Sequence, residues 1–307
     1  MRVVRMMAVH DESDVLEYNL DWYWRAGLAT VVLIDEHPDG RCQRICEQAL
    51  FDGKIIALDS IRTDGFQWDT VLARLLELAE RTGPEFLLLT APDEFFEVAD
   101  GSPLRAALES DAEAGYNLIK FHNMEFAITR DDDQADPNPL TRMRHYALND
   151  VINYRGFPYV EGIDLITALG HRPVFPEPLE DRESPRRYVG RHYPLRTVDQ
   201  ALHKISRTRP LERMPTVHTQ YLRFSGDPEE LLVDPALLSY YADDHQWCYE
   251  ERFLARRLQH TAQALGRSEV EGRRLRRDLD ELRAENAELR ARLTRLEGGG
   301  EVTPETG

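Results

Sequence analysis

The sequence predicts an α/β fold in which helices flank an open, mostly parallel sheet. Two observations support this. Over the first hundred residues, short apolar runs alternate with longer amphipathic stretches, which is the pattern of strands joined by crossover helices. Apolar residues also make up 42% of the 307 residues, enough to build a sizeable core. We expect a helical extension and a C-terminal coiled coil to follow the sheet.

The elements of the sheet can be placed from apolar runs and from helical periodicity. The expected buried strands cover residues 3–9, 30–34, 54–58 and 86–90. Between the first two strands, apolar residues recur at i, i+4, i+7 and i+8 from Leu16, and Gly27 follows where a left-handed helix cap is needed. A second helix is predicted over residues 66–81. Ligands in such sheets bind beyond the carboxyl ends of the strands, so residues 10–12, 34–40 and 90–95 should converge on one crevice.

The pattern is less regular between Ala91 and Thr216. We expect loops to dominate there, apart from a strand over residues 117–122. Residues 228–265 have apolar residues at helical spacing and are predicted to form the helical extension.

The clearest local pattern is a heptad repeat near the C-terminus. Leucines fall seven residues apart from Leu275 to Leu296, and Leu279, Asn286 and Leu293 lie between them. With the leucines at d, a single Asn at a favours a parallel, two-stranded coiled coil. The alternative is a single solvated helix, which would leave six leucines in water. The predicted divisions are 1–227 for the sheet domain, 228–265 for the extension, 266–297 for a coiled coil that pairs through 275–296 in a homodimer, and 298–307 for a flexible tail.

Charge and cysteine content exclude several classes of protein. Asp and Glu number 55 against 38 Lys and Arg, so the formal net charge is −17 and a general nucleic-acid-binding role is disfavoured. No apolar run is long enough for an integral membrane segment, and the first residues do not read as a signal peptide, so a cytoplasmic location is expected. The three cysteines are expected to be ordinary reduced thiols.

Two carboxylate positions follow predicted strands. Asp93 and Glu94 come after the strand over 86–90, where carboxylates can hold a divalent ion. The alternative is a helix cap or a surface pair. Asp35 ends an otherwise apolar strand, and nucleotide-binding folds use an acid there to accept hydrogen bonds from ribose.

A third candidate lies at the start of a predicted helix. Thr197 and Gln200 have the spacing of a capping box, with Arg196 just before it and Lys204 one to two turns inside. A helix N-terminus next to Arg196, His192 and Lys204 is a plausible anion site. A surface helix with ordinary basic residues is the alternative.

Taken in order, these segments resemble a known family. They read Met7-Ala-Val-His-Asp11-Glu12, Val31-Val-Leu-Ile-Asp35, Phe86-Leu-Leu-Leu-Thr-Ala-Pro-Asp93-Glu94-Phe95, Leu169-Gly170-His171 and His192-Tyr193-Pro-Leu-Arg196-Thr197. This order is similar to that of bacterial family 2-like glycosyltransferases of the "DxDEF" type, over roughly residues 1–225. The resemblance implies a GT-A fold and inverting transfer of a sugar from a nucleotide-diphosphate donor, usually with Mg or Mn.

The resemblance also implies roles for individual residues. Glu12 and Asp35 would lie beside the nucleotide, and Asp93 would meet the metal and the diphosphate. His192 and Arg196 would face the phosphates, and Lys204 joins them by its place in the helix. The sequence departs from the family at Ala91, where the first Asp of Asp-x-Asp usually stands. Weaker metal binding, greater reliance on the three basic residues and loss of activity are therefore all open.

An inverting transfer also needs a base to accept the proton of the acceptor hydroxyl. Glu125 is the first candidate by position, and Asp164 and His171 are the others. The predicted function is an inverting glycosyltransferase with an unidentified acceptor. The alternative is a non-catalytic subunit that binds a sugar nucleotide or glycan and assembles through its coiled coil. A nucleotidyltransferase is less favoured, because no Gly-rich phosphate loop follows the first strand.

Overall fold

The computed structural model describes residues 1–35, 39–63, 67–167, 170–208 and 227–241, with only the backbone described at 149–152 and 207–208. The chain divides into two compact units, Met1–His245 and Gln246–Gly307. The second unit lies outside the described residues, and with it the predicted coiled coil and tail. Among the helices of the described ranges, none has the length and apolar character needed to cross a membrane.

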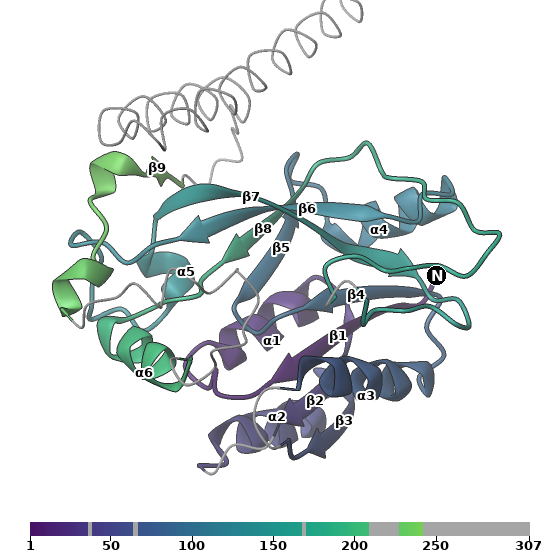
Figure 1. Cartoon of the computed structure of the whole chain (residues 1–307), viewed down its shortest axis with the longest axis horizontal. Helices are drawn as coiled ribbons and strands as arrows, with labels where there is room; N and C mark the ends of the chain where they lie inside the picture. Colours follow the sequence, from purple (N-terminus) through teal and green to yellow (C-terminus); the bar gives the residue numbers. More distant parts are fainter. Residues whose placement is uncertain (36–38, 64–66, 168–169, 209–226, 242–307) are drawn as a thin grey trace, which may run out of the picture. The chain divides into compact units, whose positions relative to one another are not determined.

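The first part of the chain forms the predicted parallel layer (Figure 1). Its elements are β1 (Val3–Val9), α1 (Leu16–Arg25), β2 (Ala29–Asp35), α2 (Arg41–Phe51), β3 (Ile55–Ile61), α3 (Trp68–Glu80) and β4 (Phe86–Thr90). The strands lie in the order β3-β2-β1-β4, and each neighbouring pair is parallel. The β-α-β pattern predicted for this part of the chain is confirmed.

Both faces of this layer are covered because side chains alternate along each strand. Val4 and Met6 of β1 pack with Leu72 and Leu75 of α3 in one apolar cluster. The other face belongs to α1 and α2. The second cluster includes Met7, Val9, Leu16, Leu20, Val32, Ile34, Cys42 and Cys46. Each fully buried Leu side chain contributes roughly 1.5–3 kcal/mol, so the two clusters hold the strands in register.

Helix α1 ends as predicted at Gly27. The φ angle of Gly27 is +75°, in the left-handed region that strains other residues. Its N–H donates to the carbonyl of Trp24 at 2.9 Å, and Leu28 donates to the carbonyl of Tyr23 at 3.1 Å. These bonds satisfy the last helical carbonyls and turn the chain into β2.

The later elements extend the sheet, and the sequence predicted only two of them, the strand over 117–122 and the helix that begins after Thr197. The later elements are β5 (Glu94–Val98), α4 (Leu104–Glu113), β6 (Ile119–Phe126), α5 (Pro139–Arg142), β7 (His145–Pro158), β8 (Tyr188–His192) and α6 (Val198–Thr208). The sheet continues from β4 in the order β7-β6-β8-β5. Only β6 and β8 are parallel in this part of the described chain. The expectation of a mostly parallel sheet therefore holds for the first half of the described sheet. The stretch after Ala91, where loops were expected to dominate, also contains four strands and three helices among its described residues up to Thr208.

Strand β5 shows why most of the later elements were not predicted. Its sequence Glu-Phe-Phe-Glu-Val contains two acids, yet all five residues are buried. Glu97 can be buried because Arg191 of β8 donates to it, with Nη2 2.5 Å from Oε2 and Nε 3.2 Å from Oε1. The partners are 94 positions apart. The local sequence therefore contains the acid but not the cation that neutralises it, and so gives no sign that this strand is buried.

The predicted helix over residues 228–265 is wrong where the structure describes it. Residues 227–241 form two short 3-10 helices, η2 (Pro228–Leu231) and η3 (Pro235–Leu237), and strand β9 (Ser239–Tyr240), which pairs with β7. The cause is a repeated Asp-Pro pair. Asp227 and Asp234 are extended and accept from the N–H two residues on, and proline disfavours the helical conformation in the residue before it.

Candidate functional site

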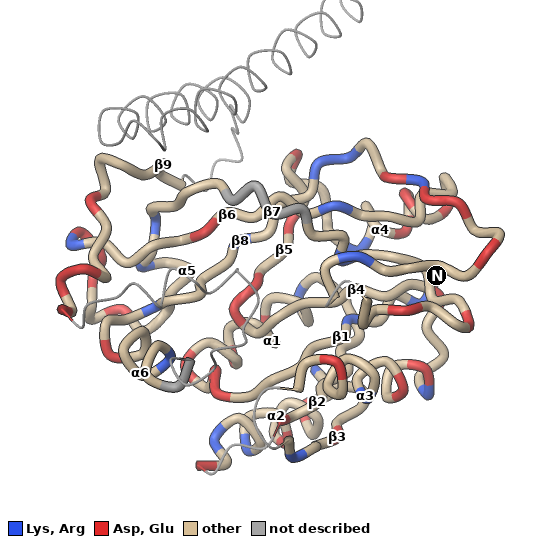
Figure 2. The backbone as a smooth tube through the Cα atoms, in the orientation of Figure 1, with Lys and Arg blue, Asp and Glu red and all other residues tan. Residues whose placement is uncertain are grey.

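Three segments meet at the edge of the sheet where β1, β2 and β4 end, and charged residues of both signs lie on them (Figure 2). The loop after β1 reaches β2 through His10, whose Nδ1 lies 3.1 Å from the backbone oxygen of Asp35. The same loop reaches α6 through Asp11, whose Oδ2 lies 2.9 Å from Nε2 of His203. The turn after β4 meets α6 through Asp93. The structure therefore brings together the segments expected to converge.

Asp93 lies at the centre of a group of cations. Its carboxylate is buried, and Oδ2 accepts a hydrogen bond from Nζ of Lys204 at 3.3 Å. Nε2 of His192 lies 3.7 Å from the same oxygen and Nη1 of Arg196 lies 3.8 Å from it. The structure thus joins the predicted metal-binding acid to all three predicted phosphate-binding residues.

The surrounding charges decide the protonation state of Asp93. Burial alone would raise the pKa of the carboxyl group. The attraction of Lys204, His192 and Arg196 for the charged form outweighs burial and lowers the pKa well below the usual range. Asp93 is therefore a carboxylate at neutral pH.

His192 bridges two acids. Nδ1 of His192 lies 2.8 Å from Oε2 of Glu125, on the opposite side of the ring from Asp93. The pairing of β6 with β8 puts Glu125 directly beside His192. Burial alone would lower the pKa of His192, but the two carboxylates raise it well above its usual value. The ring is therefore an imidazolium at neutral pH, with a donor facing each acid.

Arg196 binds mainly to a different acid, Asp14. Its Nε and Nη2 donate to the two carboxylate oxygens of Asp14 at 2.7 and 2.8 Å, and Nη1 donates to the carbonyl of Tyr193 at 2.9 Å. The side chain of Arg196 is only 1% exposed, whereas that of Asp14 is 42% exposed. Arg196 therefore holds the loop after β1 against the segment that enters α6.

The predicted cap at the start of α6 is present with one change. Thr197 Oγ1 accepts from the N–H of Gln200 at 3.1 Å, as in a capping box. The side chain of Gln200 reaches the N–H of Arg196 at 3.0 Å, one residue before the position expected for the box. The cap fixes the direction in which α6 leaves the sheet edge and so places Lys204 near Asp93.

Glu94 belongs to a separate buried cluster. Its side chain is 4% exposed, Oε1 lies 3.1 Å from Nη2 of Arg155, and Oε2 accepts from the N–H of Ala91 at 2.8 Å. The N–H of Glu94 donates to the carbonyl of Ala91 at 3.2 Å and closes the turn. These contacts make Glu94 a brace for the turn that carries Asp93.

The two other candidate bases also have local roles. Nδ1 of His171 lies 2.5 Å from Oδ1 of Asn153, and burial is the main cause of a lowered pKa of the ring. Arg155 donates to the carbonyl of Gly170 beside it at 3.1 Å, so His171 lies in the cluster of Glu94. Asp164 accepts from the N–H of Ile166 at 2.6 Å in an exposed turn. Of the three, Glu125 is the one that contacts the Asp93 group.

The two predicted nucleotide-binding acids lie at the edge in local hydrogen bonds. Glu12 Oε2 accepts from the N–H groups of His10 and Asp11 at 3.2 and 3.0 Å. Both oxygens of Asp35 accept from Oγ1 of Thr63, at 3.1 and 3.0 Å. Part of the loop after Asp35, residues 36–38, lies outside the described residues.

A divalent metal is a poor fit to the donors around Asp93. Hard cations take oxygen ligands, and Mg²⁺ usually binds through one or two carboxylates together with waters and substrate phosphates. Position 91 supplies none, and the described residues contain no group of three or more acids, histidines or cysteines arranged to hold a metal. The groups that face Asp93 are instead Lys204, His192 and Arg196, all cationic. The predicted Mg or Mn site does not match this arrangement.

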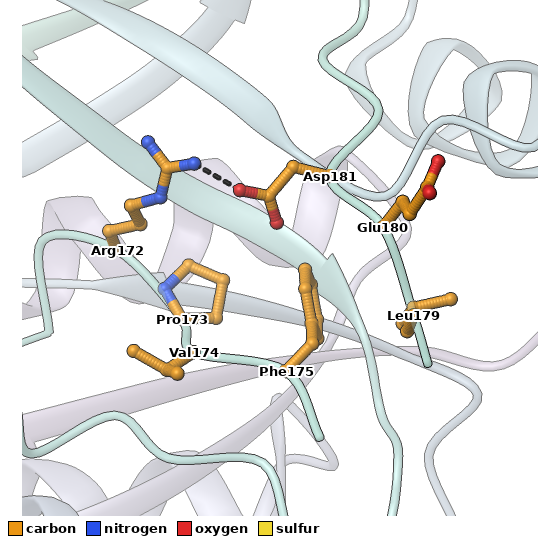
Figure 3. Close-up of a pocket in the computed structure, with 7 residues that line it drawn as sticks. All are labelled: Arg172, Pro173, Val174, Phe175, Leu179, Glu180 and Asp181. Carbon is orange, nitrogen blue, oxygen red and sulfur yellow. Dashed lines mark hydrogen bonds and ion pairs between the residues drawn. The ribbon is translucent and has the colours of Figure 1, made fainter. Parts of the chain in front are cut away.

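An open pocket of about 370 Å³ lies in the segment after His171 (Figure 3). It is lined by Arg172, Pro173, Val174, Phe175, Leu179, Glu180 and Asp181. Arg172 pairs with Asp181 across its rim and lies over the ring of Tyr154, 4.9 Å from the ring centre. Arg172 and Asp181 neutralise one another, which leaves Glu180 as the other charged residue of the lining.

Several residues of the site were missing from the sequence prediction. Asp14, which holds Arg196, and Arg155, which holds Glu94, are 182 and 61 positions from their partners. Asp11 and His203 form a further pair at the same edge. His203 and Lys204 are neighbours on a helix whose start was predicted, so the His could have been included. Asp14 and Arg155 carry no comparable signal in the sequence.

Comparisons with known proteins give distant likenesses. No protein-family model matches the chain, and no curated protein matches it. A mannosyltransferase, PcManGT from Pyrobaculum calidifontis, solved with GDP-Man and Mn²⁺, is 15% identical, with a TM-score of 0.35 over 93% of this chain and 87% of that chain. TarS 1-349 of S. aureus, solved with UDP, is 12% identical, with a TM-score of 0.36 over 93% and 92%. A UDP-glucose pyrophosphorylase solved with UDP-glucose is 8% identical, with a TM-score of 0.27 over 61% and 92%. At these TM-scores the likenesses carry no argument about activity.

Proposed function

We propose that the chain is an inverting glycosyltransferase that moves a sugar from a nucleotide-diphosphate donor to an acceptor hydroxyl. One observation carries this proposal. The motifs that resemble the "DxDEF" glycosyltransferases are spread over almost two hundred residues, and Asp11, Asp35, Asp93, His192 and Lys204 nevertheless lie on segments that contact one another at one sheet edge. Ligands of open α/β sheets bind at this kind of edge.

The chemistry follows from the placement of the cations. In an inverting transfer the bond between the anomeric carbon and the diphosphate oxygen breaks, and the leaving oxygen keeps the electron pair. Lys204 and His192 are partly exposed cations beside Asp93, so they are suited to stabilise the charge that develops on the diphosphate. Arg196 is too deeply buried against Asp14 to meet a ligand without rearrangement. Its proposed role is to position α6 and Lys204.

Glu125 is the proposed base. It would accept the proton of the acceptor hydroxyl as that oxygen bonds to the anomeric carbon on the face opposite the leaving group. Support comes from its partly exposed side chain and its contact with His192, which links it to the Asp93 group. Glu94 has no such support, because its two carboxylate oxygens bind Arg155 and Ala91.

A non-catalytic subunit that binds a sugar nucleotide or glycan is the second candidate. Two observations favour it: Ala91 replaces an expected metal ligand, and the Asp93 carboxylate is already neutralised by cations. A binder would need the nucleotide site at Asp35 but not the base.

The test is a donor screen with UDP-, GDP- and dTDP-sugars, each with Mn²⁺ and with EDTA. We expect one donor to raise the melting temperature and to release its nucleoside diphosphate, and Glu125→Gln to keep the melting shift while losing the release. A shift without release in the unaltered chain would favour the binding subunit. Neither shift nor release with any donor would contradict both candidates.

Two further proposals concern the chain as a whole. The heptads over 275–296 support a parallel homodimer, and a nucleotide-sugar donor supports a cytoplasmic location. We propose no single acceptor class, because the described residues of the edge are compatible with both a glycan and a small molecule.

A further inference from the structure

We propose that the Lys204 ammonium stands in for a divalent metal, so that this chain binds the diphosphate of its donor without Mg²⁺ or Mn²⁺. The inference rests on the proposed function, since it concerns the same site. Under this inference Asp93 is not a metal ligand, and its role is to hold the Lys204 ammonium in place. Three features of the described residues support it.

The first feature is the turn at Ala91. Its N–H donates to Glu94 Oε2 at 2.8 Å, and its carbonyl accepts from the N–H of Glu94 at 3.2 Å and from Nδ2 of Asn19 at 3.4 Å. The backbone at this position is therefore fixed by its own hydrogen bonds. Without a carboxylate at position 91, Asp93 is the one acid that this turn offers to a ligand at the edge.

The second feature is the distance between Asp93 and Lys204. A Mg²⁺ ion binds a carboxylate oxygen at about 2.1 Å, so an ion on Asp93 Oδ2 would lie within about 5.4 Å of the Lys204 ammonium. His192 and Arg196 lie 3.7 and 3.8 Å from the same oxygen, but each is paired with an acid of its own, Glu125 and Asp14. The repulsion of an ion on Asp93 therefore comes mainly from the Lys204 ammonium, whose bond to this oxygen the ion would have to displace.

The third feature is the way in which Lys204 is held. Nζ donates to the carbonyl of Pro194 at 3.1 Å as well as to Asp93, so two acceptors on different segments fix the ammonium. Its side chain is 28% exposed, whereas that of Asp93 is 7% exposed. The positive group therefore lies nearer to solvent than its acid, as a site for phosphate oxygens requires.

The first experiment measures the binding of UDP and GDP to the full chain by calorimetry, in EDTA and in Mn²⁺. We expect the two dissociation constants to agree within about threefold, and Lys204→Met to weaken binding about 10- to 100-fold in EDTA, the usual range for the loss of a charge-assisted bond. Lys204→Arg should retain most of the affinity because it keeps the cation. Lys54→Met is the matched control, since Lys54 is 27% exposed and bonded to Asp21 at 2.6 Å away from the site.

The second experiment needs no nucleotide. Mn²⁺ binding is followed by electron paramagnetic resonance for the unaltered chain, for Ala91→Asp alone, and for Ala91→Asp combined with Lys204→Met. We expect a gain in Mn²⁺ affinity of about tenfold or more only in the double variant, because it alone adds a carboxylate and removes the ammonium. Lys54→Met should bind Mn²⁺ as the unaltered chain does.

The outcomes separate this inference from the proposed function. Nucleotide binding that strengthens tenfold or more with Mn²⁺ would overturn the inference and leave the proposed function standing. Failure of any nucleotide to bind would count against the proposed function, and the Mn²⁺ measurements would still decide the role of Lys204. A chain that binds Mn²⁺ tightly through Asp93 with Lys204 in place would refute it directly.

Discussion

Replacement of Glu94 by Gln tests whether this acid takes part in the reaction or braces the fold. The Gln side chain has nearly the same shape and can still accept from the N–H of Ala91, so the change removes mainly the negative charge. That charge faces Nη2 of Arg155 at 3.1 Å, and the two side chains are 4% and 10% exposed. Glu94→Gln therefore leaves a buried cation without its acid.

The expected loss of stability follows from this distance. At an effective dielectric constant of about 20, two unit charges 3.1 Å apart attract by ~5 kcal/mol before the cost of removing them from water. Measured losses for a buried pair broken on one side are about 3–5 kcal/mol. We expect Glu94→Gln to fall in that range, which is roughly 6–20 °C in melting temperature for a domain of this size. Arg155→Met should lose a similar amount.

Urea unfolding of the two single variants and the double variant measures the effect. The double variant should lose less than the sum of the singles, with a coupling of about 1–3 kcal/mol, because removal of both charges leaves neither one buried alone. Nucleotide affinity should survive in Glu94→Gln at temperatures where the protein is folded. A stable Glu94→Gln protein that has lost turnover would refute the bracing role and restore Glu94 as a catalytic acid.

Three other predictions address the rest of the chain. Asp35→Ala should weaken nucleotide binding with little change in melting temperature, because Asp35 lies at the edge; unchanged affinity in calorimetry would count against its role. Protonated His192 stabilises the folded state through its two neighbouring carboxylates. This contribution to the free energy of unfolding is complete below about pH 6.5 and is lost as pH rises through the elevated pKa of His192 in the folded state. Urea unfolding across alkaline pH should show that loss in the unaltered chain and not in His192→Gln. Deletion of residues 266–307 should convert a dimer into a folded monomer, and Asn286→Leu should stabilise the assembly while mixing its oligomeric states; a full-length monomer in sedimentation equilibrium would contradict both.

The predictable part of the fold is the part whose burial is visible in the sequence. Strand β4 coincides with an apolar run that ends in Thr90, strand β1 with an apolar run broken only by Arg5, and the cap at Gly27 has a direct backbone cause. Strands β5 and β8 are also largely buried, but their buried residues include Glu97 and Arg191, which bind each other between these two neighbouring strands. A local pattern cannot show that two charges 94 residues apart will cancel. The mixed half of the sheet was therefore not predicted.

The same limit applies to the candidate site. The segments that meet at the edge could be predicted, because parallel strands of one sheet end on the same side. The partner of each charged residue could not be predicted from the sequence. Glu94 stands beside Asp93 in the sequence and resembles it chemically, yet one carboxylate braces a turn with Arg155 and the other faces three cations. Which of two neighbouring acids faces the ligand depends on residues elsewhere in the chain.

The exposure of each ion pair gives a reason why an acidic chain can still receive an anionic donor. Each of the three cations around Asp93 has an acid: Lys204 has Asp93, His192 has Glu125, and Arg196 has Asp14. With the pairs intact their net charge is zero, so attraction for a diphosphate depends on which partner lies outward. Lys204 lies outward from Asp93, whereas Arg196 lies inward from Asp14. The donor is therefore expected to meet Lys204 first, and Asp14 is expected to repel it. On this reasoning Asp14→Asn, which keeps hydrogen-bond acceptance by one oxygen while removing the exposed charge, should tighten nucleotide binding at a cost in stability, because the buried Arg196 loses its acid. Asp93→Asn should weaken nucleotide binding by releasing the lysine.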